Sequence, residues 1–243
     1  MTGGYLEMQM SGHIVGPIVA FGEYIFRDVL VAFDNLSQRA DKIANDYYHR
    51  IGAQPAGEYG DIDMADVADD ANEESLNWYQ MMTSMRQTML NLLASGLFHL
   101  TEQQLATMRR DGGFRAVPPR DTKFGVVEEW YQANLHLDWK TLPSWKLMDE
   151  LRLVANAVKH AEGSATRQLR TLRPELFSNP DYAEIYAEYE KHGIEQTMGP
   201  VFAPLSGEDL FVSEKLLREY AEGAKSFFGE IAAYFEAHDK DYF

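Results

Sequence analysis

Residues 74–111 read "ESLNWYQMMTSMRQTMLNLLASGLFHLTEQQLATMRRD", and large apolar side chains recur in them at intervals of three and four. That spacing is typical of one face of an α-helix. A helix of this length must bury its apolar face against other helices, so the stretch predicts an all-α fold, an antiparallel helical bundle with long helices. We interpret the methionines as core residues, because methionines at helical spacing usually pack in a core. The apolar positions are Trp78, Met81, Met82, Met85, Met89, Leu92, Leu93, Leu97, Leu100 and Leu105.

The same helical spacing precedes this stretch. Residues 14–50 are expected to form one long helix, because their apolar side chains also recur at steps of three and four. Residues 53–74 are acidic and poor in large apolar groups, so they predict a linker or surface loop that leads into the next helix. The chain is therefore expected to be a single α-helical domain spanning 1–243, with its helical core at about 14–50 and 75–237.

The remainder of the chain predicts shorter helices and one small β-element. Two short β-prone runs, "PVFAP" (200–204) and "DLFVS" (209–213), flank a turn that contains glycine, which predicts a small β-hairpin near 200–213. The expected helices cover about 126–136, 144–160, 164–177, 180–193 and 214–237.

Composition excludes several classes of chemistry. The chain has no cysteine, so disulfides, thiolate metal sites and cysteine nucleophiles are ruled out. No apolar run approaches the roughly 18 residues that a membrane span needs, and the N-terminus lacks the basic start of a signal peptide. We expect a cytoplasmic protein that does not enter a membrane.

The charge of the chain is unevenly distributed. The formal net charge is −16, which repels nucleic acid over most of the surface. Between Lys140 and Arg173, however, seven Lys and Arg residues face three acidic ones, so 7 − 3 = +4, and the rest of the chain carries −20. This basic island predicts either a site for an anion or an ordinary fluctuation of charge along the chain.

Motifs for common cofactors and metals are missing from the sequence. It contains no HExxH, no pair of Glu-x-x-His motifs, and none of GxxxxGK[ST], GxGxxG or GxSxG. His99 and Glu102 stand three residues apart, but one such pair is weak evidence for a metal. We therefore expect no metal and no nucleotide cofactor.

The basic island contains "LRLVANAVKHAEG" at residues 151–163, which carries the strongest indication of chemistry. Asn156 and His160 are four apart and share one helix face, Arg152 lies a turn earlier on that face, and Lys159 is one step off. Histidine can move a proton, while arginine and lysine can hold a phosphate and its developing charge. RNA supplies its own 2′-hydroxyl nucleophile, so this set can cleave RNA without a metal.

A purely structural interpretation of the same stretch stays open. Lysine and histidine are favourable in the last turn of a helix by about 0.3–1 kcal/mol, because the exposed carbonyls there carry partial negative charge. Lys159 and His160 occupy that turn. Gly163 follows the helix, at a place where a residue in the left-handed conformation is common. Asn156 can simply form a hydrogen bond with an unpaired backbone group at the end of a neighbouring helix.

The decapeptide "LRLVANAVKH" (151–160), which follows "LLASGLFHLTEQQL" (92–105), resembles the HEPN superfamily. These are α-helical domains of bacterial and archaeal defence and toxin systems, and many are metal-independent ribonucleases. The superfamily motif is an arginine, a polar residue, three to five further residues and a histidine. Asn156 and His160 match the polar and histidine positions, whereas the arginine position falls on Ala155.

The resemblance implies a metal-independent endoribonuclease, a toxin or phage-defence effector that acts as a homodimer with the two motif helices facing each other across a cleft. His160, Asn156 and Arg152 would be catalytic, and Lys159, Arg167 and Arg170 would hold the RNA. Superfamily members with degenerate motifs serve instead as non-catalytic binding or assembly modules. That alternative implies a protein partner, either an antitoxin or a subunit of a defence complex.

Overall fold

The computed structural model describes residues 10–53, 63–193 and 199–238, and its regular elements within these ranges are all helical. The all-α fold class is therefore confirmed. None of the described helices combines the length and the apolar character that crossing a membrane requires. The α-helices are α2 (Gly16–Tyr24), α3 (Leu36–Gly52), α4 (Met64–Asp111), α5 (Phe124–Leu135), α6 (Trp145–His160), α7 (Ser164–Leu172), α8 (Ala183–Lys191) and α9 (Glu214–Ala237).

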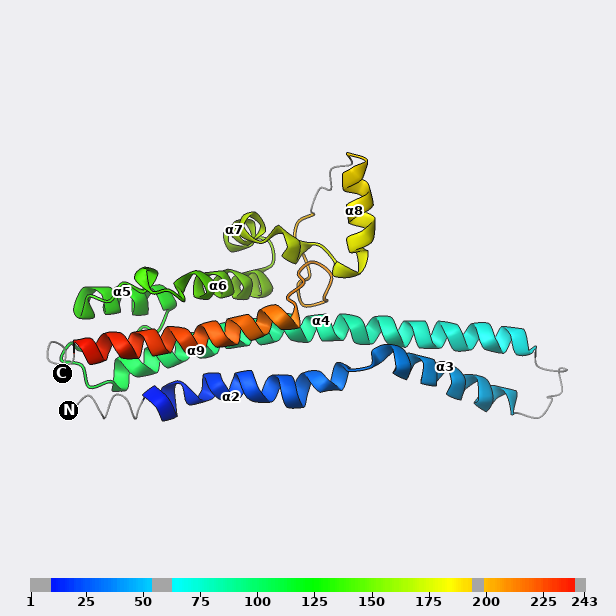
Figure 1. The fold of residues 1–243 in the computed structure, drawn as a ribbon, viewed down its shortest axis with the longest axis horizontal. Helices are drawn as coiled ribbons and strands as arrows, with labels where there is room; N and C mark the ends of the chain where they lie inside the picture. The colour runs from blue at the N-terminus through cyan, green and yellow to red at the C-terminus, as the bar shows by residue number, and fades with distance from the viewer. Residues whose placement is uncertain (1–9, 54–62, 194–198, 239–243) are drawn as a thin grey trace.

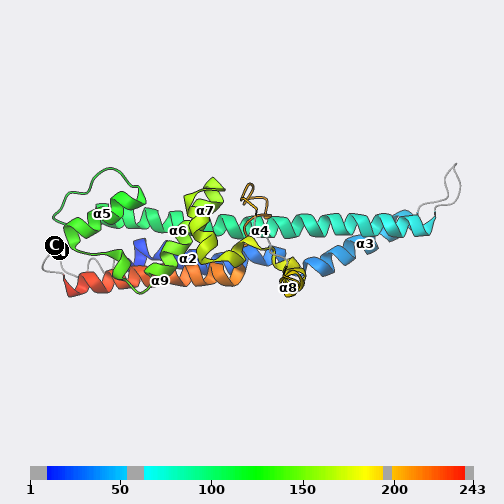
Figure 2. The same cartoon turned by 90° about the horizontal axis from the view of Figure 1, so that it is seen from above.

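Helix α4 is the axis of the molecule. It contains 48 residues, which at 1.5 Å per residue makes it about 72 Å long. Helices α2 and α9 run along one half of α4, and α3 packs on the other half to form a two-helix arm (Figures 1 and 2). Helices α5, α6 and α7 lie over the half that α9 covers, and α8 projects away from the body (Figure 1).

The core lies where the C-terminal half of α4 meets α5, α6 and α9. Its largest enclosed side chains are aromatic, and they contact one another in a continuous cluster; they include Tyr131, Trp139, Tyr220, Phe227, Phe228 and Phe235. The interpretation of the methionine stripe as core is only partly right. Met81 and Met85 are 54% and 48% exposed, so this part of α4, on which α3 packs, leaves a face with methionine side chains uncovered.

The prediction of one helix over 14–50 is wrong. Helix α2 runs into a π-helical turn (Ile25–Val29) and a 3-10 turn (Leu30–Phe33), and the chain then breaks before α3. Asn35 adopts a left-handed conformation with φ of 56°, which asparagine tolerates better than most residues. Arg39 stabilises the break by donating from Nη1 to the carbonyl of Ala32 at 2.6 Å.

Helix α4 begins at Met64 rather than near residue 74, so part of the expected acidic linker is helical. Asp63 caps the helix by accepting a hydrogen bond from the N–H of Ala65 at 2.8 Å. Val67 and Ala71, four residues apart, are buried on one face of this first stretch. The start of α4 thus has a buried apolar face and a capped end, although most of its residues are acidic or exposed. Residues 54–62 of the expected linker lie outside the described ranges.

The β-hairpin predicted near 200–213 is not formed, because side chains take the hydrogen bonds that a partner strand would make. Asn91 of α4 is fully buried and donates from Nδ2 to the carbonyls of Pro204 and Leu210 at 2.7 and 2.8 Å. Its Oδ1 lies 3.3 Å from the backbone nitrogen of Val212, which donates to it. The segment is therefore a loop held on α4.

Two residues within this loop fix its turn. Asp209 Oδ2 accepts from the backbone N–H groups of Phe202 and Ala203 at 2.9 and 2.7 Å, so a carboxylate replaces the cross-strand ladder. Gly207 has φ of 78°, and a Cβ atom placed on it would lie 2.8 Å from the carbonyl oxygen of Ser84. Only glycine fits where the loop touches α4 so closely.

Candidate functional site

Helix α6 contributes three of the four predicted motif residues to a groove of about 440 Å³ between α4, α5 and α6. We call it the α4–α6 groove. Arg152, Asn156 and Lys159 line it from α6, because steps of three and four keep them on one helix face. The other lining residues are Phe98, His99 and Glu102 of α4, Phe124, Gly125 and Glu128 of α5, Lys140, and Trp145 and Asp149 of α6.

Arg152 and Asn156 are oriented by contacts within their own helix. Arg152 Nε donates to Asp149 Oδ1 at 2.8 Å, and Arg152 Nη2 lies 2.7 Å from the same oxygen. Asn156 Nδ2 donates to the carbonyl of Arg152 at 2.9 Å, which holds the amide along the helix. Both side chains are half-buried, so each keeps part of its surface toward the groove.

Lys159 and His160 stand exposed in the last turn of α6. Lys159 lines the α4–α6 groove, whereas His160 follows it at the helix end and is not among the lining residues. The left-handed position expected at Gly163 belongs to Ala161, with φ of 54°, and Gly163 is extended. A residue other than glycine rarely adopts such a φ, so the backbone directly after His160 is strained.

His99 and Glu102 of α4 form a pair on the wall of the groove. His99 Nδ1 lies 3.2 Å from Glu102 Oε2, and Glu102 Oε1 accepts from the N–H of Phe124 at 3.1 Å. The carboxylate thereby orients the imidazole and ties the start of α5 to α4. The spacing of three was visible in the sequence, but nothing there indicated that this pair lies across from α6.

Lys140 and Glu128 form a second pair in the groove, with Nζ and Oε1 3.2 Å apart. The hydrogen bond and the negative charge of Glu128 raise the pKa of Lys140 above its ordinary value. Counting Arg152 with Asp149 and His99 with Glu102, every carboxylate of the groove has a basic partner. Lys159 adds one further cation to the lining, which favours an anionic ligand.

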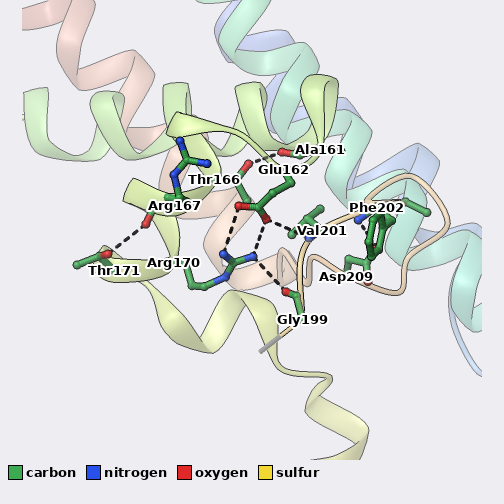
Figure 3. Close-up of polar contacts among 11 residues, drawn as sticks. Ala161, Glu162, Thr166, Arg167, Arg170, Thr171, Gly199, Val201, Phe202 and Asp209 are labelled. Atoms are coloured by element: carbon green, nitrogen blue, oxygen red, sulfur yellow. Dashed lines mark hydrogen bonds and ion pairs between the residues drawn. The ribbon is translucent and has the colours of Figure 1, made fainter. Parts of the chain in front are cut away.

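Arg170 lies outside the groove. It connects α7 to Glu162, just after α6, and to Gly199. Its Nη2 donates to Glu162 Oε2 at 2.9 Å and to the carbonyl of Gly199 at 3.3 Å, as Figure 3 shows. The hydrogen bonds from Arg170 and from the N–H of Val201 lower the pKa of Glu162. Arg167 is exposed on α7 and does not line the groove either.

Ala155, at the arginine position of the superfamily motif, is 1% exposed and packs in the core. An arginine at this position would point into the apolar interior and away from the groove. Arg152 is therefore the only guanidinium that α6 brings to the groove.

Among the described residues, no group of three or more histidine, aspartate or glutamate side chains is arranged to hold a metal ion. Comparison of the chain with protein-family models, with curated proteins and with solved structures found no match.

Proposed function

We propose that the chain is an HEPN-like, metal-independent endoribonuclease that acts at the α4–α6 groove, as a toxin or phage-defence effector. One observation carries the proposal: Arg152, Asn156 and Lys159 line the same groove as the His99–Glu102 pair. Cations, an amide and an imidazole held by a carboxylate are the groups that phosphodiester cleavage needs when no metal takes part.

The chemistry is a transfer within the RNA. A neutral imidazole takes the proton of a 2′-hydroxyl, whose oxygen attacks the adjacent phosphorus. The bond from phosphorus to the 5′-oxygen breaks, and a protonated group gives that oxygen its proton. The products are a 2′,3′-cyclic phosphate and a 5′-hydroxyl. Lys159 and Arg152 offset the charge that develops on the phosphate oxygens, while Asn156 orients the phosphate or the imidazole.

Two histidines share the proton transfers in this proposal. His160 holds the position that the superfamily resemblance marks as catalytic, and α6 ends directly after it at Ala161. His99 lies in the groove with Glu102 behind it, an arrangement that holds an imidazole in one tautomer and orientation. One imidazole then serves as base and the other as acid.

Replacing either histidine is expected to reduce cleavage strongly. Loss of a positioned acid or base typically lowers a rate by about 10²–10⁴-fold, so His160→Ala and His99→Ala should each show that loss in a gel assay with labelled RNA. His49→Ala, at an exposed position on α3 far from the groove, is the matched control and should keep the wild-type rate. Wild-type rates in both His160→Ala and His99→Ala would exclude this assignment of the acid and the base.

The proposal includes a homodimer in which the exposed ends of the two α6 helices meet. Lys159 and His160 are both exposed there, so a second copy can approach them and double the local positive charge. Light scattering is expected to give twice the 27.7 kDa of the chain. A mass of 27.7 kDa that does not change with concentration would contradict the dimer.

A specific observation favours a second function, a non-catalytic binding module. Arg152 is paired with Asp149, and Asn156 donates to its own helix, so neither group needs a substrate to satisfy it. In this case the groove holds RNA or a protein partner, an antitoxin or a defence-complex subunit, without cleavage. Retention of intact RNA by the purified chain, with no products after long incubation, would favour the module over the enzyme.

A further inference from the structure

Arg109, near the end of α4, is 3% exposed and has no carboxylate partner among the described residues. Its Nη2 donates to the carbonyls of Pro119 and Asp121 at 3.1 and 2.6 Å. Its Nε and Nη1 have no hydrogen-bond partner in the described part of the chain. The loop between α4 and α5 thus covers the guanidinium but accepts hydrogen bonds from only one of its three nitrogens.

A buried guanidinium is costly unless a negative charge stands beside it, because arginine cannot lose its proton to become neutral. Two backbone carbonyls offer partial charges only, and water can accept the remaining hydrogen bonds without supplying charge. The nearby Glu102 is already engaged with His99 and with the N–H of Phe124. Arg109 therefore lacks a counter-charge among the residues that the structure describes.

Arg109 lines a cavity of about 660 Å³ that suits an anion in size and charge. Cavities of roughly 300–1,000 Å³ commonly hold small molecules. Arg110 and Arg120 join Arg109 in the lining, against the single carboxylate of Glu102. Arg110 is also paired with Asp111, but Arg109 and Arg120 leave a local surplus of positive charge in a chain of net charge −16. Thr107 and Thr122 add hydroxyl donors to the same lining.

We propose that this cavity is a binding site for a phosphate group, carried either by a small molecule or by RNA. The phosphate supplies the counter-charge for Arg109, and Arg120 closes on it from the loop between α4 and α5. A phosphate fits better than a lone carboxylate because it offers more acceptor oxygens and more charge to several guanidinium groups at once.

The cavity adjoins the α4–α6 groove. Glu102 lines both of them, so it forms the wall between the phosphate site and the His99 imidazole. An RNA strand can therefore place one phosphate over Arg109 while another lies in the groove. The phosphate site itself does not depend on cleavage, and it can hold its ligand in a chain that is only a binding module.

Isothermal titration calorimetry with two probes tests the site. The first probe is inorganic phosphate, and the second is a short 2′-O-methyl RNA with or without a 5′-phosphate, which cannot be cleaved through a 2′-hydroxyl. Binding of inorganic phosphate assigns the site to a small molecule. Binding of the RNA alone, tighter with its 5′-phosphate, assigns it to RNA. Arg109→Met should abolish either binding.

Arg120→Ala provides a second variant at an exposed loop position, in case Arg109→Met fails to fold. It should weaken binding about 10-fold, since a hydrogen bond to a charged group is worth that much or more. Arg50→Ala, at an exposed position at the end of α3, should bind as the wild type does. The proposal is overturned if neither probe binds the wild type, or if Arg120→Ala binds as tightly as the wild type. The calorimetric readout involves no cleavage, so it can fail while the ribonuclease proposal stands.

Discussion

Ala155→Arg is expected to unfold most of the chain, although the substitution restores the superfamily motif. Ala155 is 1% exposed and lies on the core side of α6, between Leu151 and Val158, which are also buried. An uncompensated buried charge costs about 3–5 kcal/mol, and overpacking a core adds about 1–3 kcal/mol. Their sum, about 4–8 kcal/mol, matches the whole free energy of unfolding of a domain in the lower part of the ordinary range of about 5–15 kcal/mol.

Thermal or denaturant unfolding followed by circular dichroism measures this loss. Lys159→Arg places an arginine at an exposed position on the same helix and should unfold like the wild type. If Ala155→Arg instead keeps the free energy of unfolding within about 1 kcal/mol of the wild type, the placement of α6 in the core is wrong. The motif arginine would then be available to the groove after all.

Asn91→Leu is expected to have the second large effect, because one amide satisfies three backbone groups of the loop over residues 204–212. The substitution leaves the carbonyls of Pro204 and Leu210 and the N–H of Val212 without their partner. A buried polar group without a partner costs about 1–3 kcal/mol, so the loss of partners for three such groups should lower the free energy of unfolding by about 3–9 kcal/mol.

Denaturant unfolding also measures this effect, with Asn77→Leu as the matched control at an exposed position of α4. The control should change the free energy of unfolding by less than about 0.5 kcal/mol. Proteolysis should in addition open the loop at 204–212 in Asn91→Leu before the helices are cut. An unchanged denaturant midpoint in Asn91→Leu would show that the conformation of the loop does not depend on its hydrogen bonds to α4.

Periodicity predicted the long helices because their burial follows the helical repeat. Helices α6 and α9 begin and end close to the expected residues, since their apolar faces are continuous and their ends are marked by Ser144, Ser213 and the residues after His160. The break between α2 and α3 escaped prediction, because a single left-handed Asn35 interrupts a repeat that is otherwise regular.

The loop over 200–213 shows a different limit. Val201, Leu210 and Val212 are buried as expected of a strand, although Phe202 is exposed. The backbone partners come from Asn91 and Asp209 rather than from a second strand. A side chain more than a hundred residues away along the sequence decides the outcome. Local propensity carries no information about such a partner.

The candidate site was predictable only on one helix. The spacing of Arg152, Asn156 and Lys159 was enough to place them on one face. The opposite wall, with His99 and Glu102, depends on how α4 crosses α6, and single-sequence patterns do not give that angle. For the same reason no pattern in the sequence marks Arg109, since its burial under the loop between α4 and α5 is a tertiary feature.

The most direct test of the ribonuclease proposal is cleavage of a labelled single-stranded RNA by the purified chain in excess EDTA, with the product ends identified by mass spectrometry. We predict cleavage that survives EDTA and leaves a 2′,3′-cyclic phosphate and a 5′-hydroxyl, because the attacking group is the RNA's own 2′-hydroxyl and a positioned histidine moves the proton. Intact RNA under these conditions, or products that end in a 3′-hydroxyl, would contradict it.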